Sequence, residues 1–301
     1  MSKKVFAILL ILLFLLSILS VIINACCLPI IQPKELKESV TVTETVPETI
    51  PETTFLETVT ETTEAEISYF DTIDERIRFN VEDGMFPESW YDEPSNAKVE
   101  SSKPENIEAS RVLAIKALKK YPDEFLFEYL DKAYFLNFLG FFGVEFGGTN
   151  SSRLKTIYVT NNGINQGDAN YKIEQNIHSE LSSIPYKENI NLFPKVEWEK
   201  INPNNFIYIY SNGVEALISG EASITFDPLL NEEGFLYEYA KSTLSNDYSS
   251  IVENLFLNDG TFWEIYEKYP IIKAKTNLAI AFYNKLNPTF TLEYFKKISK
   301  E

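Results

Sequence analysis

The sequence has little of the chemistry on which most enzymes depend. Its 301 residues include one histidine, His178, and two cysteines, Cys26 and Cys27. A single histidine excludes any mechanism that needs two imidazoles from one chain. Because residues 28–301 contain no thiol, disulfides and cysteine nucleophiles are excluded there as well. There is also no G-x-S-x-G motif and no glycine-rich phosphate-binding loop.

Basic residues are the second shortage. The chain has 27 Lys and Arg against 44 Asp and Glu, which gives a formal charge of −17. Without a local basic patch, such a chain has no long-range attraction for phosphate backbones, so we expect no nucleic-acid partner. Apolar residues are plentiful at 45%, and aromatic residues make up 14%. This composition is typical of a chain with a packed core.

The first 25 residues indicate export. They include two lysines, no acid, and an apolar stretch from residue 5 to residue 23. Residues 23–26 (INAC) resemble the lipobox of bacterial lipoproteins, in which the cysteine is lipidated and becomes the mature N-terminus. We therefore expect a lipoprotein signal peptide at 1–25 and lipidation of Cys26. An uncleaved membrane helix is the alternative, since 19 residues rise about 28 Å. Both interpretations place the rest of the chain outside the cytoplasmic membrane, with the membrane as a partner.

Residues 26–68 are predicted to be a disordered spacer. Residues 38–66 contain eight Glu, ten Thr, two Pro and no basic residue, so they lack the apolar surface needed to offset the entropy of ordering. Extended at about 3.1 Å per residue, they would span on the order of 90 Å. The alternative, an edge strand, is opposed by Pro47, Pro51 and the repeated Glu.

Residues 69–301 are predicted to form one α+β domain. Few strands are expected in the first half, as a small mixed sheet packed on one helix, and many helices in the second half. Periodicity and turn signals predict strands at 133–143, 154–160 and 206–210. They predict helices at 104–120, 170–184, 232–245, 247–257, 261–286 with a break at Pro270, and 291–298. In helix 104–120 the predicted apolar face comprises Ile107, Val112, Ile115 and Leu118.

The helix predicted at 170–184 carries an acidic side chain next to its buried face. Asp168 is expected to cap it and Pro185 to stop it. At about 100° per residue, the buried stripe consists of Ile173, Ile177, Leu181 and Ile184. Glu180 lies about 60° from the centre of this stripe, so we expect it either to be hydrogen-bonded to a neighbouring strand or to be functional. His178 lies about 200° from Glu180, so the two side chains point to opposite sides of the helix.

The sequence of this helix and of the segments around it resembles a known protein family. The run from Gly147-Gly148-Thr149 through Ile157-Tyr158-Val159 to residues 176–184 (NIHSELSSI) is similar to bacterial zinc-binding metallopeptidases. These are zincin-like lipoproteins whose corresponding helix reads close to HHEFSHIL or HHEFSS. The resemblance covers about 190 residues, 109–298. It continues through Gly234-Phe235, Tyr239-Ala240, Asn246-Asp247-Tyr248, residues 270–273 and Phe282-Tyr283.

The resemblance implies a zincin-like fold whose metal site is degenerate. It places Ser179 and Ser183 at the two histidine positions, Glu180 at the general-base position, and Asn246 at the third-ligand position with Asp247 beside it. Neutral serine and asparagine are poor zinc ligands, so we expect the domain to bind no cofactor. The expected function is then a binding or structural module. The alternative is an active or weakly active metal-dependent peptidase that binds zinc and uses Glu180 with Asp247 or another carboxylate.

Two further sets of residues complete the expected site. Using His178 as a ligand would require shifting the alignment, which the helix geometry opposes. Tyr237 and Tyr239 lie near the third-ligand helix and are candidates to line a peptide-binding groove, because tyrosine contributes large contact area at low entropic cost. The alternative is that both are packing residues. The Gly147-Gly148 pair is expected to form a turn.

Overall fold

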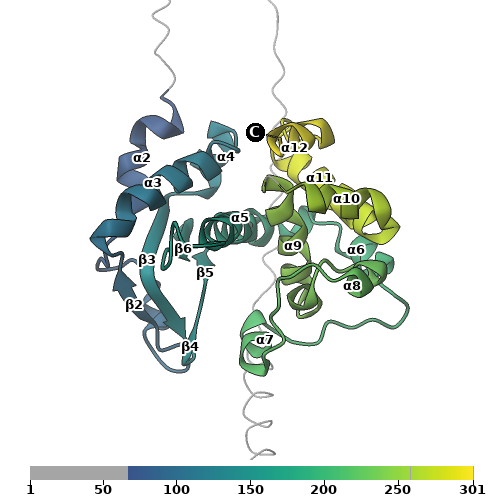
Figure 1. The fold of residues 1–301 in the computed structure, drawn as a ribbon, viewed down its shortest axis with the longest axis horizontal. Helices are drawn as coiled ribbons and strands as arrows, with labels where there is room; N and C mark the ends of the chain where they lie inside the picture. Colours follow the sequence, from purple (N-terminus) through teal and green to yellow (C-terminus); the bar gives the residue numbers. More distant parts are fainter. Residues whose placement is uncertain (1–66, 258, 301) are drawn as a thin grey trace, which may run out of the picture. The chain divides into compact units, whose positions relative to one another are not determined.

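The computed structural model describes residues 67–257 and 259–300 (Figure 1). The predicted signal segment, Cys26 and residues 26–66 of the predicted spacer lie outside the described residues. Near the start of the described residues, Ser68 forms a capping box with Asp71, and its hydroxyl donates to Asp123 at 2.5 Å. In the described part of the chain, no helix is both long and apolar enough to cross a membrane.

A six-stranded mixed sheet forms the first half of the domain. Its strands are β1 (Ile77–Arg78), β2 (Lys98–Ser101), β3 (Lys132–Phe141), β4 (Val144–Glu145), β5 (Gly148–Ser151) and β6 (Thr156–Thr160). The order is β1-β3-β6-β5, with β2 and β4 also paired to β3. β1 and β6 run parallel to β3, whereas β5 runs antiparallel to β6 and ends the strand order. The strands predicted at 133–143 and 154–160 are thereby confirmed.

Both faces of this sheet are covered. Side chains alternate along β3 and β6, so Phe135 and Val159 join the main core, while Tyr134 and Tyr158 join a smaller cluster with Met85. Short helices and two longer ones flank the sheet. They are η1 (Tyr69–Thr72), α2 (Ile73–Arg76), η2 (Glu88–Trp90), α3 (Pro104–Leu118) and α4 (Asp123–Tyr129).

Helix α3 lies where the sequence predicts it, but its buried face is rotated. Val112 is 59% exposed, whereas Leu113, Ala114 and Ala117 are buried. The prediction of Val112 as a core residue was wrong because small residues, which carry a weak periodic signal, form much of the packed face.

Helix α5 (Ala169–Glu188) contacts the sheet on one side and α9 on the other, and Figure 1 shows it between them. It continues past Pro185, which the sequence predicted to stop it. Pro185 and Tyr186 are buried, and the Tyr186 ring stacks on Tyr248 at 4.8 Å between centroids. We attribute the continuation to this packing, which offsets the hydrogen bond that proline cannot donate. Asp168 occupies the N-cap, but its side chain makes no capping hydrogen bond.

The second half of the domain is helical. It contains η3 (Ile190–Leu192), α6 (Lys195–Ile201), α7 (Gly213–Ser219), α8 (Pro228–Glu233), η4 (Glu238–Lys241), α9 (Leu244–Phe256), α10 (Gly260–Lys268), α11 (Pro270–Leu286) and α12 (Leu292–Ile298). The helices predicted at 247–257, 261–286 with a break at Pro270, and 291–298 are confirmed. The α+β class is therefore correct, with a mixed sheet followed by a helical half.

Two predicted elements of this half are wrong. Residues 232–245 do not form one helix, because Gly234 ends α8 at a φ of 93° and the chain turns before η4. Residues 206–210 form no strand. Ile207 is 82% exposed, and the nearby backbone N–H groups of Ile209 and Tyr210 bond to the carbonyl groups of Lys241 and Ser242 rather than to a strand. An alternating apolar pattern does not make a strand without a partner strand.

Candidate functional site

The candidate site is a cavity of about 460 Å³ lined by residues of β5, α5, α7, η4 and α9, of the connection that precedes β5, and of the loops that follow α7 and α8. Its lining includes the four principal positions that the resemblance identifies, Ser179, Glu180, Ser183 and Asn246. It also includes Tyr237 and Tyr239. Residues separated by up to about a hundred positions in the sequence are therefore brought together at one cavity.

Helix α5 contributes one polar face to this cavity. Ser179 and Ser183 are four residues apart and therefore lie on the same side of the helix, with Glu180 beside them. Gln175 and Asn176, one turn earlier, line the same cavity. The Ser183 hydroxyl donates to the Ser179 carbonyl at 3.3 Å and lies 3.5 Å from the Ser249 hydroxyl of α9.

Helix α9 contributes a second polar face. Asn246, Ser249 and Glu253 follow each other at intervals of three and four residues, so they share one side of the helix. The Asn246 amide donates to the Ser242 hydroxyl at 2.8 Å, and its backbone N–H is capped by Thr243. Asn246 therefore lies at the cavity as predicted, with a neutral partner.

Glu180 is held by the edge strand of the sheet. Its Oε2 accepts a hydrogen bond from Asn150 Nδ2 at 2.6 Å, and Lys187 Nζ donates to Asn150 Oδ1 at 2.7 Å. The prediction of a hydrogen bond to a neighbouring strand is thus confirmed. Burial raises the pKa of Glu180, and its contacts with Asn150 and Lys187 oppose this rise.

Gly148 permits this close approach of strand and helix. A Cβ atom at this position would lie 2.9 Å from Glu180 Cγ and 3.2 Å from the carbonyl oxygen of Tyr158. Gly147 is similar, since a Cβ there would lie 2.8 Å from Asn176 Nδ2. Gly147 lies at a bend between β4 and β5, in line with the predicted turn, whereas Gly148 is the first residue of β5. A separate turn at Phe142 and Gly143, which have positive φ, joins β3 to β4. The two glycines at 147 and 148 therefore serve close packing against α5.

Glu253 is a second carboxyl group in the cavity. Only 5% of its surface is exposed. It accepts hydrogen bonds from Gln175 Nε2 at 2.7 Å and from the Tyr237 hydroxyl, and Ser179 is a further partner. Burial raises the pKa of Glu253 to about 7, and the nearby charge of Glu180 adds to this rise. All of these hydrogen-bond donors are neutral, so none supplies a countercharge.

His178 faces away from the cavity, as the helix geometry predicts. Its side chain is fully buried, Nδ1 lies 2.9 Å from the Tyr121 hydroxyl, and Nε2 lies 3.8 Å from Glu174 Oε1. The ring stacks on Phe256. Burial lowers the pKa of His178 to about 4, so the imidazole is neutral at pH 7. His178 is therefore a core residue and has no part in the cavity.

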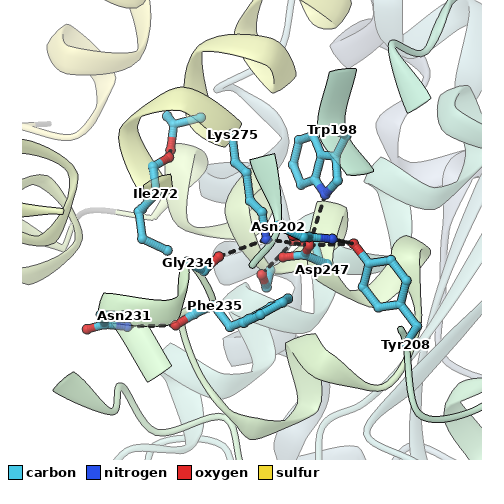
Figure 2. A network of polar contacts seen from close by, with 11 residues as sticks. Trp198, Asn202, Tyr208, Asn231, Gly234, Phe235, Asp247, Ile272 and Lys275 are labelled. Carbon is cyan, nitrogen blue, oxygen red and sulfur yellow. Dashed lines mark hydrogen bonds and ion pairs between the residues drawn. The ribbon is translucent and has the colours of Figure 1, made fainter. Parts of the chain in front are cut away.

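Asp247 also points away, although it follows Asn246 directly. Figure 2 shows its carboxylate inside the helical half, where Oδ2 accepts three hydrogen bonds. They come from Lys275 Nζ at 2.7 Å, Trp198 Nε1 at 2.9 Å and the Tyr208 hydroxyl at 2.7 Å. Asp247 is therefore unable to assist Glu180, and its assignment as a candidate site residue is corrected.

The lining of the cavity does not fit a zinc ion. Zinc sites in proteins are built from imidazole, thiolate and carboxylate ligands. Ser179, Ser183 and Asn246 offer only neutral oxygen and amide groups. Throughout residues 67–257 and 259–300, no three His, Cys, Asp or Glu side chains are grouped so that they could hold a metal ion. The arrangement instead provides two carboxyl groups, several hydroxyl and amide groups, and apolar side chains at one cavity.

Sequence reasoning missed two important members of this site. Glu253 lies seven residues after Asn246, so a single helix covering both would have placed it on the same face. The predicted helix began at 247 and left this relation unseen. Asn150 had no comparable signal, because its role depends on the position of β5 beside α5.

Comparisons with known proteins do not extend these observations. No family model matches the chain, and neither a curated protein nor a solved structure matches it. The geometry of the cavity is therefore the basis on which its function is inferred.

Proposed function

We propose that the described domain is a peptide-binding module of a membrane-tethered extracytoplasmic lipoprotein. Its scaffold is zincin-like and has lost zinc and catalysis. The observation that carries this proposal is the position of the cavity at the outer edge of β5, where Gly148 and Asn150 form part of its lining.

The backbone of β5 supports binding of an extended peptide. The Gly147 carbonyl accepts a hydrogen bond from the Thr160 N–H of β6. Because hydrogen-bonding direction alternates along an antiparallel strand, Gly148 and Asn150 direct their N–H and C=O groups away from β6. β5 ends the strand order, so these groups lie on the outer edge of the sheet. An extended peptide can add to such an edge as a further strand.

The size and composition of the cavity agree with this ligand class. Its volume of about 460 Å³ falls within the range of roughly 300 to 1,000 Å³ found for ligand sites. Val214 and Leu217 of α7 and Ile224 provide apolar contacts, while Tyr239 and Glu180 provide polar ones. Backbone pairing would supply affinity, and these side chains would supply selectivity.

A matched pair of variants on α7 tests peptide binding. Leu217 lines the cavity, whereas its neighbour Ile218 is 63% exposed and does not. Peptides selected by the full chain on an array would be measured by fluorescence polarisation. We expect Leu217→Glu to weaken binding by at least about tenfold, equivalent to 1.4 kcal/mol, and Ile218→Glu to leave it unchanged. Equal affinities for both variants, or no selected peptide, would contradict the proposal.

A second experiment tests the zincin-like scaffold. Replacing Ser179 and Ser183 by His would place two imidazoles at i and i+4 with Glu180 between them and Glu253 in the same cavity. We expect elemental mass spectrometry to find close to one equivalent of zinc in the double variant and little in the natural chain. Glu253→Gln in the double-His background should reduce the bound zinc. Failure of the double variant to bind zinc would remove the scaffold assignment without affecting the peptide proposal.

The alternative, a metal-dependent peptidase using Glu180, gains one observation, because Glu253 adds a carboxyl group to the cavity. It requires metal in the natural chain. Near-stoichiometric zinc in the purified natural chain, together with peptide cleavage that Glu180→Gln abolishes, would establish it in place of the binding module.

A further inference from the structure

A buried lysine and a buried aspartate meet in the helical half, outside the cavity. Lys275 of α11 and Asp247 of α9 have side chains 0% and 1% exposed, and Lys275 Nζ lies 2.7 Å from Asp247 Oδ2. The Nζ atom also lies 3.9 Å from the centroid of the Phe235 ring and 5.8 Å from that of Trp198. Figure 2 shows Phe235 and Trp198 beside the pair, and the exposures of 0% and 1% mean that bulk water does not reach it.

The two carboxyl oxygens of Asp247 have very different surroundings. Oδ2 accepts hydrogen bonds from Trp198 Nε1 and the Tyr208 hydroxyl in addition to Lys275. Oδ1 is buried and has no hydrogen-bond partner. A buried carboxylate oxygen without a donor is unfavourable, and most such atoms in proteins are satisfied. The site therefore provides donors for one oxygen of Asp247 only.

The surroundings of Lys275 provide too few hydrogen-bond acceptors for a charged ammonium group. An ammonium group has three N–H donors. Besides Asp247, Nζ has one oxygen acceptor, the carbonyl of Gly234 at 2.8 Å. The Phe235 ring is its other close neighbour. Apart from Asp247, the site therefore offers one strong acceptor, which is enough for the single N–H of an amide but not for the three N–H groups of an ammonium.

We propose that Lys275 and Asp247 are joined by an isopeptide bond. A secondary amide has one oxygen and one N–H. The oxygen would keep the donors Trp198 and Tyr208, and the N–H would keep the Gly234 carbonyl as its acceptor. The unpartnered oxygen would no longer exist. The polar groups around the pair thus match an amide more closely than an ion pair.

The reaction needs no other reagent. The Lys275 amine attacks Asp247 Cγ, and a C–N bond forms while an electron pair moves to Oδ2. Trp198 N–H and Tyr208 O–H would stabilise this oxyanion. When the C=O bond re-forms, the bond from Cγ to Oδ1 breaks. The nitrogen loses two of the three protons of the ammonium form, and Oδ1 leaves with them as water.

The environment favours both the attack and the persistence of the product. Burial lowers the pKa of Lys275, which increases the share of the nucleophilic neutral amine, whereas the charge of Asp247 opposes this effect. Exclusion of water disfavours hydrolysis of the amide. The bond would cross-link α9 to α11 in a domain whose sequence offers no cysteine after Cys27. This role is independent of the proposed peptide binding.

Peptide mapping of the full chain tests the bond directly. Trypsin should release residues 242–268, which contain Asp247, joined to residues 274–285, with no cleavage after Lys275. The expected mass is that of the two peptides less one further water molecule. Recovery of residues 242–268 and 276–285 only as separate peptides would overturn the proposal. Because this measurement uses the natural chain, it does not depend on the folding of a variant.

Two variants test the assigned chemistry. Lys275→Arg keeps a cation but removes the amine nucleophile, so the joined peptide should be absent. Tyr208→Phe removes one donor to Oδ2 and leaves both reacting groups in place. We expect this variant to form the bond at least about tenfold more slowly after synthesis. Pulse labelling and peptide mapping measure the rate of bond formation. An unchanged rate would overturn the role assigned to Tyr208.

Discussion

Two acidic residues of helix α9 illustrate how similar burial can serve different purposes. Asp247 is 0% exposed and Glu253 is 5% exposed. Asp247 contacts Lys275, Trp198 and Tyr208, so its charge is balanced by Lys275 before the proposed amide forms and is absent from the amide itself. Glu253 has only neutral hydrogen-bond donors and shares its cavity with Glu180. The depth of burial therefore does not distinguish a structural carboxyl group from one at a candidate site, whereas the charge of its partner does.

The difference has an energetic basis. A buried charge is tolerated when an opposite charge and hydrogen bonds replace the lost water. Asp247 meets this condition at Oδ2 only, where Lys275 supplies the opposite charge until the proposed amide forms. Glu253 does not, and the burial that raises its pKa to about 7 makes it a group that changes protonation near neutral pH. A ligand that supplies a donor or a cation to this cavity would be favoured by the same deficit.

The largest expected effect comes from removing the Lys275 amine beside Asp247. Lys275→Met should lower the free energy of unfolding by about 3 to 5 kcal/mol, because an uncompensated charge remains in the core. Urea unfolding followed by circular dichroism measures this effect. The double variant Lys275→Met with Asp247→Leu should recover part of the loss. A single variant as stable as the natural chain would contradict the structural role of the pair.

The second effect is a pH dependence specific to Glu253. Its pKa is raised from 4.5 to about 7, so the folded state retains a proton that the unfolded state loses. This contribution to stability is complete below about pH 4.5 and is lost as pH rises to 7. Between about pH 4.5 and pH 7, the free energy of unfolding of Glu253→Gln should therefore rise by up to about 3 kcal/mol relative to that of the natural chain.

This comparison isolates Glu253 from other titrating groups. His178, whose pKa is lowered to about 4, contributes stability that is present above pH 6.5 and is lost as pH falls toward 4. Because both chains contain His178, its contribution cancels in the difference between them. Urea midpoints of the two chains at several pH values provide the measurement. A difference in stability that does not vary with pH would show that Glu253 titrates normally.

A smaller effect is expected from Gly148→Ala at the other carboxyl group. The added methyl group would contact Glu180 Cγ and the Tyr158 carbonyl too closely, so the strand or Glu180 must move. We expect a loss of about 1 to 3 kcal/mol in the free energy of unfolding, together with weaker peptide binding. Gly260→Ala is the control, because a Cβ atom there has no neighbour within 4 Å. Thermal unfolding that shifts equally in both variants would contradict the packing role of Gly148.

The smallest effect concerns a neutral contact between α5 and α9. The Ser249 hydroxyl lies 3.3 Å from that of Ser182 and 3.5 Å from that of Ser183. Since both contacts are long and involve no charge, Ser249→Ala should change the free energy of unfolding by no more than about 1 kcal/mol. A loss comparable to that of Lys275→Met would show that neutral groups at the cavity hold the two helices together.

The candidate site was predicted in part. The family resemblance grouped Ser179, Glu180, Ser183 and Asn246, and these four residues line one cavity. The roles that the resemblance implies for them stay predictions. Asp247 was wrongly included because adjacency in sequence says little about direction on a helix, where successive side chains are about 100° apart. Glu253 was missed because its position depends on how α9 packs against α5.

The sequence by itself determined the local features of this protein. Periodic apolar residues specified α9 to α12, apolar runs specified β3 and β6, and the angle between side chains placed His178 opposite Glu180. Only the tertiary structure decided that α5 continues through Pro185, that Asp247 meets Lys275, and that Glu253 faces Glu180. Periodicity and turn signals arise from neighbours along the chain, whereas these contacts join residues distant in sequence. Their energies depend on packing and on the exclusion of water, which exist only once the elements have assembled.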